Sequence, residues 1–454
     1  MMLAVTAVTP TRETFGNIPN LSQAIFYVLA AAATAVFIAG VWRRFRLWRQ
    51  GQPIDLAALL RGNLASRIAA FRPGIYRVLV EGFGQQRIRG RGLPSRAHAW
   101  LVAGFLMLLL GTTLLEVDHL ASMLSSRLKF HQGAYYVGYE FTLDLFGLAF
   151  LAGVILFFWR RLRRPSSVGH RGTDWYVLIS FLAIGLTGYA VEALQMIWQR
   201  PEGIGAHCSP VGYWLASLFP SLQEGPARSL HLGIWWVHSL LVFGFIASIP
   251  FTRLFHTVAG PLNLFLARPN LGQLQPITLE QVEKDERLGV SRIRHLTQQQ
   301  LVSLDACMEC GRCEEACPAF ATGKPLSPKS VVQTLKRVME TLPPVGRAAL
   351  PASAGETEAD PGDVHAKISA ETLWACTACS ACTFVCPVRV DPVGLILDMR
   401  RHLVAEGGLA GTAATALRRL QSNANPWGLA PAERGDWRQG LATEPSGGPT
   451  PPPS

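Results

Sequence analysis

Two cysteine-rich stretches in the last third of the sequence carry the pattern with the clearest chemistry. Each follows the spacing Cys-x2-Cys-x2-Cys-x3-Cys-Pro, once over 307–318 and again over 376–387. This spacing is typical of paired 4Fe–4S clusters, in which three close thiolates bind one cluster and the fourth binds the other. The eight predicted ligands are Cys307, Cys310, Cys313, Cys317, Cys376, Cys379, Cys382 and Cys386.

The fourth cysteine of each motif is expected to cross to the other cluster. The trio that begins at Cys307 would then share a cluster with Cys386, and the trio that begins at Cys376 would share one with Cys317. The alternatives are zinc and disulfides. Structural zinc more often uses two Cys-x2-Cys pairs, and disulfides are disfavoured on the cytoplasmic side argued for below. The ninth cysteine, Cys208, stands alone.

Composition indicates that much of the remaining chain lies in a membrane. Of its 454 residues, 49% are hydrophobic and only 16% are charged. Long apolar runs predict five spanning helices, and Trp or Tyr stands at several ends, as expected of interface anchors. The runs are Ala24–Val41, Ala97–Val117, Tyr135–Trp159, Trp175–Trp198 and Leu230–Phe251.

The net charge of +11 is concentrated in alternate loops between these spans. Residues 43–96 hold twelve arginines and 160–171 hold five, whereas 118–134 and 199–229 hold two basic residues each. Because loops rich in Arg and Lys stay in the cytoplasm, the N-terminus is predicted outside and the cysteine motifs inside a cytoplasmic (inner) membrane. Basic residues in this arrangement indicate topology and contact with membrane lipid, and no nucleic-acid partner is expected.

Histidines lie within or beside the predicted spans, where an ionisable side chain is costly and usually functional. His238 lies in the fifth span, and His256 follows eighteen residues later, five helical turns along the same face. His98 begins the second span at the cytoplasmic side, and His119 ends it at the outer side. Histidines from two antiparallel helices at two depths predict bis-histidine b haems, with His98 and His256 as the inner pair.

The sequence leaves the outer pair open. His119 is a candidate partner for His238 but lies in or near the outer loop, and His231 is on the same face as His238 and could replace it. One haem is therefore predicted at the inner pair, with a second as an alternative. The other interpretation is that these histidines cap helix ends or line water.

The histidine-bearing spans resemble a known cytochrome. The stretch from His238 to His256, with Ile249-Pro-Phe-Thr-Arg-Leu-Phe before the last histidine, resembles the final span of the gamma subunit of respiratory nitrate reductase. The second span, from His98 to Thr112, is similar to the same family. The resemblance implies two b haems, quinol exchange near the outer one, His98 and His256 on the inner haem and His238 on the outer. The family's second histidine in that span is absent from Met107–Thr112 here.

Such a cytochrome followed by a dicluster domain resembles the membrane-bound iron–sulfur oxidoreductases related to heterodisulfide reductase. Asn425-Pro-Trp-Gly428 is similar to the segment that leads into their Cys-Cys-Gly domains, a signature that this sequence lacks. The resemblance implies an electron-transport subunit that connects the quinone pool to a cytoplasmic partner, such as electron-transfer flavoprotein or a Cys-Cys-Gly subunit. The alternative is a membrane anchor that carries electrons for a separate catalytic subunit and has no quinone site of its own.

Polar residues near the outer side are candidates for quinone and its protons. Glu140 and Asp144 lie one turn apart on a helix face, and Lys129 and His131 in the outer loop are candidate contacts to a quinone oxygen. A quinol gives up two protons with its two electrons, so carboxylates at this depth could accept them. The alternative is that these groups are solvated at headgroup level.

Together these inferences predict a mostly α-helical fold, with a five-helix transmembrane cytochrome b bundle before a helical dicluster ferredoxin domain. Proline-started helical patterns at 328–340 and 392–403 favour helices over strands beside the motifs. The predicted order is an outer tail over 1–20, the membrane domain over 21–265, a linker over 266–300, the cluster domain over 301–410 and a partly disordered tail over 411–454.

Overall fold

The computed structural model describes residues 11, 14–54, 61, 63–90, 92–163, 172–201, 207–274, 276, 277, 283, 288–343 and 362–439. In these residues the elements are helices, and β pairing is limited to isolated bridges. This confirms the predicted helical class. The chain divides into two compact units, 1–275 with 291–396 and 276–290 with 397–454. The predicted disordered end of the tail lies outside the described residues, apart from its first positions.

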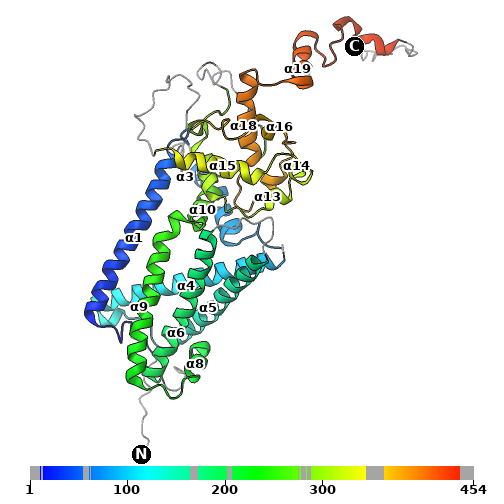
Figure 1. The fold of residues 1–454 in the computed structure, drawn as a ribbon. Helices are drawn as coiled ribbons and strands as arrows, with labels where there is room; N and C mark the ends of the chain where they lie inside the picture. Colours follow the sequence, from blue (N-terminus) through cyan, green and yellow to red (C-terminus); the bar gives the residue numbers. More distant parts are fainter. Residues whose placement is uncertain are drawn as a thin grey trace, which may run out of the picture. The chain divides into compact units, whose positions relative to one another are not determined.

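Five helices are long and apolar enough to cross a membrane, which confirms the five predicted spans. Each begins earlier than its apolar run, because polar residues can continue the backbone hydrogen bonding of a helix beyond the hydrocarbon. Packing joins α4 to α5, α5 to α6, α6 to α9 and α9 to α1 (Figure 1). The spans are α1 (Asn20–Trp48), α4 (Leu93–Leu124), α5 (Gly133–Leu162), α6 (Gly172–Gln199) and α9 (Glu224–Ser248).

Glycines allow α4 and α5 to approach each other closely. A Cβ added at Gly104 would come within 2.6 Å of the Phe146 carbonyl oxygen, and one at Gly153 within 2.6 Å of the Leu101 backbone nitrogen. Helices in a bilayer associate through such small residues, because lipid supplies no hydrophobic driving force between them. The crossing of α4 and α5 is therefore set at these two glycines.

A phenylalanine cluster fills the space between α5, α6 and α9. Phe150, Phe181 and Phe245 are buried, with ring centroids 5.4 Å apart for the first two and 4.8 Å apart for the last two. Leu108 of α4 packs against them. The stretch in which the gamma-subunit resemblance expects a second histidine therefore contributes an aliphatic side chain to the core.

The fifth span ends in short turns before the chain enters the cluster domain. Pro250 lacks a backbone N–H and cannot continue the hydrogen bonding of α9. Two 3-10 turns, η3 (Ile249–Phe251) and η4 (Arg253–Phe255), follow, and α10 (His256–Leu266) begins at the histidine itself. Pro250, which lies between His238 and His256, therefore interrupts the five helical turns by which the two histidines would share one face.

The remaining elements are short. Ser327 caps α15 by accepting a 2.9 Å hydrogen bond from the backbone N–H of Ser330, and α15 and α18 confirm the two helices predicted beside the cysteine motifs. These elements are α3 (Leu64–Tyr76), the π-helix η1 (Arg77–Phe83), η2 (Ser126–Leu128), α8 (Pro210–Ser217), η5 (Ile293–His295), α12 (Gln298–Ala306), α13 (Arg312–Glu315), α14 (Pro318–Ala321), α15 (Pro328–Thr341), α16 (Ala370–Trp374), α17 (Ala381–Phe384), α18 (Pro392–Ala405), α19 (Gly411–Asn423) and η6 (Pro431–Arg438).

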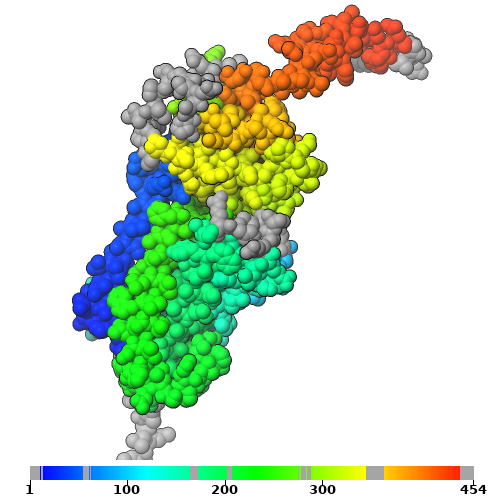
Figure 2. All heavy atoms as spheres, in the orientation of Figure 1, coloured from blue at the N-terminus to red at the C-terminus, as the bar shows by residue number. Residues whose placement is uncertain are grey.

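A buried ion network joins the end of α1 to the cluster domain. The Asp305 carboxylate is fully buried and lies 3.2 Å from Arg44 Nη1 and 3.1 Å from Lys336 Nζ. It also accepts a 2.8 Å hydrogen bond from Trp48 Nε1, and Arg44 forms a second ion pair with Glu340. In Figure 2 the residues of α15, in yellow, cover this end of the bundle beside α1, in blue. The network therefore anchors the cluster domain to the first span.

Replacing Arg44 by Met should weaken this anchor. The substitution leaves Glu340 without its partner and Asp305 with two of its three donors, and broken buried ion pairs typically destabilise a protein by about 3 kcal/mol or more. Since Lys336 and Trp48 still hold Asp305, we expect a loss of about 2–3 kcal/mol, measured by thermal unfolding of the purified protein. Arg43→Met on the exposed side of α1 should change stability by less than about 0.5 kcal/mol. Equal effects of the two substitutions would contradict the anchor.

Candidate iron–sulfur and haem sites

The two cysteine motifs have the same local backbone. Glu309 (φ 58°) and Gly311 (φ 82°) are left-handed in the first, and Ala378 (φ 52°) and Ser380 (φ 60°) occupy the equivalent positions in the second. Left-handed non-glycine residues are uncommon and tend to occur at functional sites. In each motif a short helix follows these left-handed residues directly and carries the third cysteine. This helix is α13 in the first motif and α17 in the second.

The structure groups the cysteines across the two motifs. The Cys386 thiol interacts electrostatically with Cys307 and Cys310 of the first motif, while Cys382 interacts with Cys317 and Cys376. Cys313 of the first motif also interacts with Cys382 of the second, so the two sets lie close together, and the exchange of the fourth ligand stays a prediction. In the described residues no three His, Cys, Asp or Glu side chains converge as the ligands of a single metal ion would; a cubane does not require that, because its four thiolates bind different irons.

The surroundings of the thiols fit iron–sulfur ligands. Burial raises the pKa of Cys382 and of Cys386 to about 12, so these thiols need the charge of bound metal to lose their protons. Backbone N–H groups donate to three sulfurs: Ala378 to Cys376 Sγ at 3.4 Å, Val390 to Cys386 Sγ at 3.3 Å and Phe320 to Cys317 Sγ at 3.5 Å. Hydrogen bonds to sulfur are among the features that set a cluster's reduction potential.

The two predicted ligand sets have different surroundings. At the first, Arg253 beyond α9 forms a 2.8 Å ion pair with Glu309, and Arg87 donates to the Cys386 carbonyl oxygen at 3.0 Å. At the second, Cys379 is exposed and the neighbouring Phe384 is 78% exposed. The first set therefore lies against the membrane domain, and the second reaches solvent at Cys379.

The arginine-rich segment after α1 is a docking element. Glu81 of η1 forms two 2.7 Å hydrogen bonds with Arg389, three residues after Cys386, and a 3.1 Å ion pair with Arg87. Burial raises the pKa of Glu81, but Arg389, Arg87 and Arg77 outweigh it and hold the pKa below its usual value. This role was not predicted from the sequence, where the arginines of the segment indicate topology. Glu81, one of two acidic residues among twelve arginines, was the available clue.

The structure brings His98 and His256 together at this end of the bundle. The two rings interact electrostatically. His98 Nδ1 is 2.8 Å from Gln85 Oε1, and His256 Nδ1 is 2.7 Å from the Arg253 carbonyl oxygen. Metal-binding histidines typically donate one ring N–H to such an oxygen, which orients the other nitrogen toward the metal. Burial also lowers the pKa of His256, which favours the neutral imidazole that an axial ligand requires.

The three histidines considered for the outer haem, His238, His119 and His231, each have different contacts. His238 Nδ1 lies 2.9 Å from Thr187 Oγ1 of α6. α4 continues to Leu124, so His119 lies in the last turns of this helix, near the loop that follows it. His119 packs edge-on against Phe15, with ring centroids 5.1 Å apart, and His231 Nδ1 lies 3.3 Å from Asn17 Nδ2. His119 and His231 are thus in contact with the segment before α1. A second haem ligand opposite His238 stays a prediction.

His131 is fully buried, although it was expected in an outer loop. Its Nδ1 lies 3.5 Å from Asp118 Oδ1. The same carboxylate oxygen accepts backbone hydrogen bonds from Phe130 at 2.6 Å and from His131 at 3.0 Å. Lys129 lies next to this corner in the chain, at the end of η2. Asp118 was missed, because its sequence neighbourhood does not reveal that the chain folds back onto it.

The two predicted carboxylates are buried under α8. Glu140 and Asp144 are 5% and 4% exposed, which does not fit the alternative of acids solvated among lipid headgroups. Ser209 Oγ donates to Glu140 Oε2 at 3.4 Å, and the Val211 N–H donates to Asp144 Oδ2 at 2.8 Å. Cys208 is buried beside Glu140, and burial raises the pKa of its thiol. The cover that residues 208–211 form over the two acids was not predicted from the sequence.

Two family matches cover the two parts of the chain that hold the predicted haem and cluster ligands. Residues 98–273 match the family described as nitrate reductase gamma subunit, and residues 303–390 match the family described as 4Fe-4S dicluster domain. The first begins at His98 and includes His238 and His256, and the second contains all eight motif cysteines. No solved structure gives a significant match.

Curated relatives combine the same parts. The chain is 30% identical over 455 residues to "EtfAB:quinone oxidoreductase" of Syntrophomonas wolfei, covering 94% of this chain and 61% of that protein. It is 27% identical over 442 residues to "Probable iron-sulfur-binding oxidoreductase FadF" of Bacillus subtilis, covering 91% and 60%. A match of 32% over 121 residues, covering 25% of this chain and 27% of the relative, links it to one component of the "Dihydromethanophenazine:CoB--CoM heterodisulfide reductase" of Methanosarcina barkeri. The chain spans about three fifths of the length of the first two relatives.

Serine substitutions test the ligand grouping. We expect Cys317→Ser to change the same cluster EPR signal as Cys376→Ser, because the two thiols would share a cluster. Cys386→Ser should change the signal that Cys307→Ser changes. Cys208→Ser serves as the control and should leave both signals intact. If Cys317→Ser alters the Cys307 signal alone, each motif closes on itself and the exchange is refuted.

Proposed function

Since the chain is a membrane-bound iron–sulfur protein related to heterodisulfide reductase, with a nitrate reductase gamma-like domain before a 4Fe-4S dicluster domain, we propose that it transfers electrons between membrane quinone and a soluble redox partner. When bound, two 4Fe–4S clusters and a b haem would supply one-electron transfer. The protein's own residues hold, insulate and tune these groups. Orientation in the membrane is part of the proposal, with the cluster domain in the cytoplasm and the N-terminus outside.

The contact between the cluster domain and the histidine end of the bundle carries this proposal. Arg253 pairs with Glu309 beside Cys310, and its carbonyl oxygen accepts from His256. Arg312, next to Cys313, interacts electrostatically with His98. A few residues thus connect the predicted ligands of the first cluster to those of the inner haem. Such proximity is what electron transfer between two bound groups requires.

The solvent-open ligand set indicates where a partner would approach. Cys379 is exposed, and Phe384 and Trp374 expose 78% and 38% of their surfaces nearby in the chain. We propose electron-transfer flavoprotein as the partner, because a relative that matches 94% of this chain is named for EtfAB and quinone. A Cys-Cys-Gly subunit is the alternative, supported by the shorter match to the heterodisulfide reductase component.

The outer side of the bundle would exchange protons with quinol. Glu140 and Asp144 are buried carboxylates on one face of α5, and His131 is a buried imidazole beside Asp118. A carboxylate or neutral imidazole in these places can accept a proton that a quinol releases with each electron. His238 is the predicted ligand of an outer haem, and His119 and His231 are the candidates for the second ligand.

Histidine substitutions test the inner haem. Either His98→Ala or His256→Ala should remove one low-spin b haem from the purified protein, because a bis-histidine site loses an axial ligand. Haem content is measured from the reduced-minus-oxidised spectrum with iron per chain. His402→Ala, on α18 away from the predicted pair in the chain, should leave haem content unchanged. Full haem in either of the first two variants would show that the pair is not the ligand set.

A quinone assay tests the function. The purified chain is placed in lipid nanodiscs without other subunits, reduced anaerobically, and mixed with a menaquinone analogue while cluster and haem absorbance are followed. We expect reoxidation by the quinone, slowed at least about tenfold in His256→Ala, since loss of a bound carrier interrupts the path. Reoxidation that begins only after another protein component is added would favour the anchor without a quinone site.

A further inference from the structure

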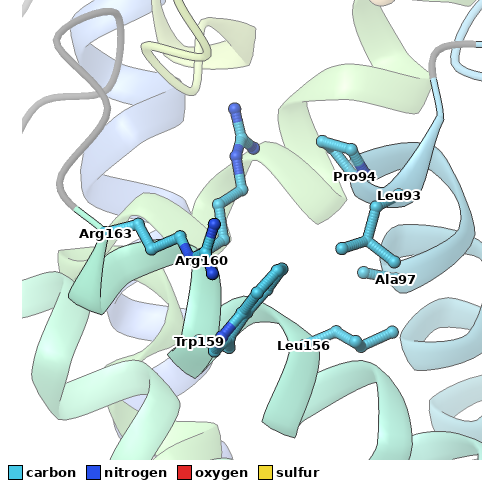
Figure 3. Close-up of a pocket in the computed structure, with 7 residues that line it drawn as sticks. All are labelled: Leu93, Pro94, Ala97, Leu156, Trp159, Arg160 and Arg163. Carbon is cyan, nitrogen blue, oxygen red and sulfur yellow. The ribbon is translucent and has the colours of Figure 1, made fainter.

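A pocket opens between α4 and α5 at the end of the bundle that bears His98. Its cavity volume is about 260 Å³, and it is lined by five apolar side chains and two arginines, with no carboxylate. Figure 3 shows Leu93, Pro94 and Ala97 on one side and Trp159, Arg160 and Arg163 on the other, with Leu156 between them. The proposed quinone and haem ligands do not include any of these residues.

The helix crossing explains why the pocket exists. α4 and α5 touch at Gly153, where an added Cβ would lie 2.8 Å from the Ala97 carbonyl oxygen. Beyond this contact α5 continues for only about two and a half turns, and α4 extends to Leu93 with Pro94 in its first turn. The two ends diverge, and the space between them is left to a ligand or to lipid.

The charge of the pocket sets the ligand chemistry. Arg161, between the two pocket arginines in the chain, pairs with Asp174. In the part of the chain that the structure describes, Arg160 and Arg163 have no such carboxylate partner. The Arg163 guanidinium lies over the Trp159 ring, 4.1 Å from its centroid. Two unneutralised guanidinium groups above an apolar wall suit an anionic headgroup with an attached acyl chain.

We propose that this pocket binds an anionic phospholipid of the leaflet on the cluster-domain side. Its position at the end of a spanning helix, beside a tryptophan and arginines, is that of the membrane–water interface. The apolar side chains would take the first part of one acyl chain, and Arg160 and Arg163 would hold the phosphate. Because Ala97 lines the pocket and precedes His98, the lipid would also support the start of α4.

Lipid retention by the full-length protein tests the proposal. The protein is purified from nanodiscs of equal parts phosphatidylglycerol and phosphatidylcholine, and bound lipid is identified by native mass spectrometry. We expect wild-type protein to retain phosphatidylglycerol, and Arg160→Gln with Arg163→Gln to reduce its retention roughly tenfold or more, since each surface arginine strengthens binding of anionic lipid. Arg43→Gln removes an exposed charge outside the pocket and should leave retention unchanged.

A second variant distinguishes lipid binding in the cavity from general attraction of anionic lipid by surface arginines. Leu93→Trp fills the cavity but keeps both arginines, and it should also lose the lipid; it decides the question if the double variant does not fold. Equal retention in wild type and the double variant, or an equal loss in Arg43→Gln, would overturn the proposal. So would a menaquinone analogue that occupies the site in place of lipid and is not displaced by phosphatidylglycerol.

Discussion

The structure depends on charges that are buried where the cluster domain meets the membrane domain. Asp305 has no exposed side-chain surface and is held by Arg44, Lys336 and Trp48. Removing an ionised carboxylate from water is expensive unless several donors replace the lost hydration. The three donors come from α1 and α15, so Asp305 is satisfied only while the two domains are docked. Glu81 with Arg389, and Arg253 with Glu309, repeat this logic elsewhere on the same face. Ionic contacts of this kind can fix the position of one domain against another, as the proposed transfer of electrons between two sites requires.

The docked position of the cluster domain is linked to the orientation of His98 and His256. His98 is oriented by Gln85, which follows η1, and His256 by the carbonyl of Arg253. Both supports belong to segments that also contact the cluster domain: η1 through Glu81, and Arg253 through Glu309. A change in docking would therefore disturb the predicted haem ligands as well as the predicted cluster ligands. The same residues thus connect folding to the proposed electron path.

Much of this arrangement was predictable from the sequence, and the reason differs for each part. The cysteine motifs are local, so their spacing alone indicates the cluster ligands. The five spans follow from the length of the apolar runs. The inner histidine pair was predicted from span ends and loop charge, whereas the spacing between His238 and His256 assumed a helix that Pro250 interrupts. What could not be predicted depends on tertiary contact: Asp118 beneath His131, the cover of 208–211 over Glu140, and Glu81 against Arg389. Their separations of 13, 69 and 308 residues match no helical or strand period, so the spacing of the residues gives no signal.

An electron cryo-microscopy map of the anaerobically purified full chain in nanodiscs would test the central claim most directly. The account predicts a haem with its iron between His98 and His256, and the cluster bound by Cys307, Cys310, Cys313 and Cys386 nearer to that haem than the second cluster. It also predicts that Arg253 and Glu309 lie between them. A map with the cluster domain detached from this end of the bundle, or with the Cys376 cluster nearer to the haem, would contradict it.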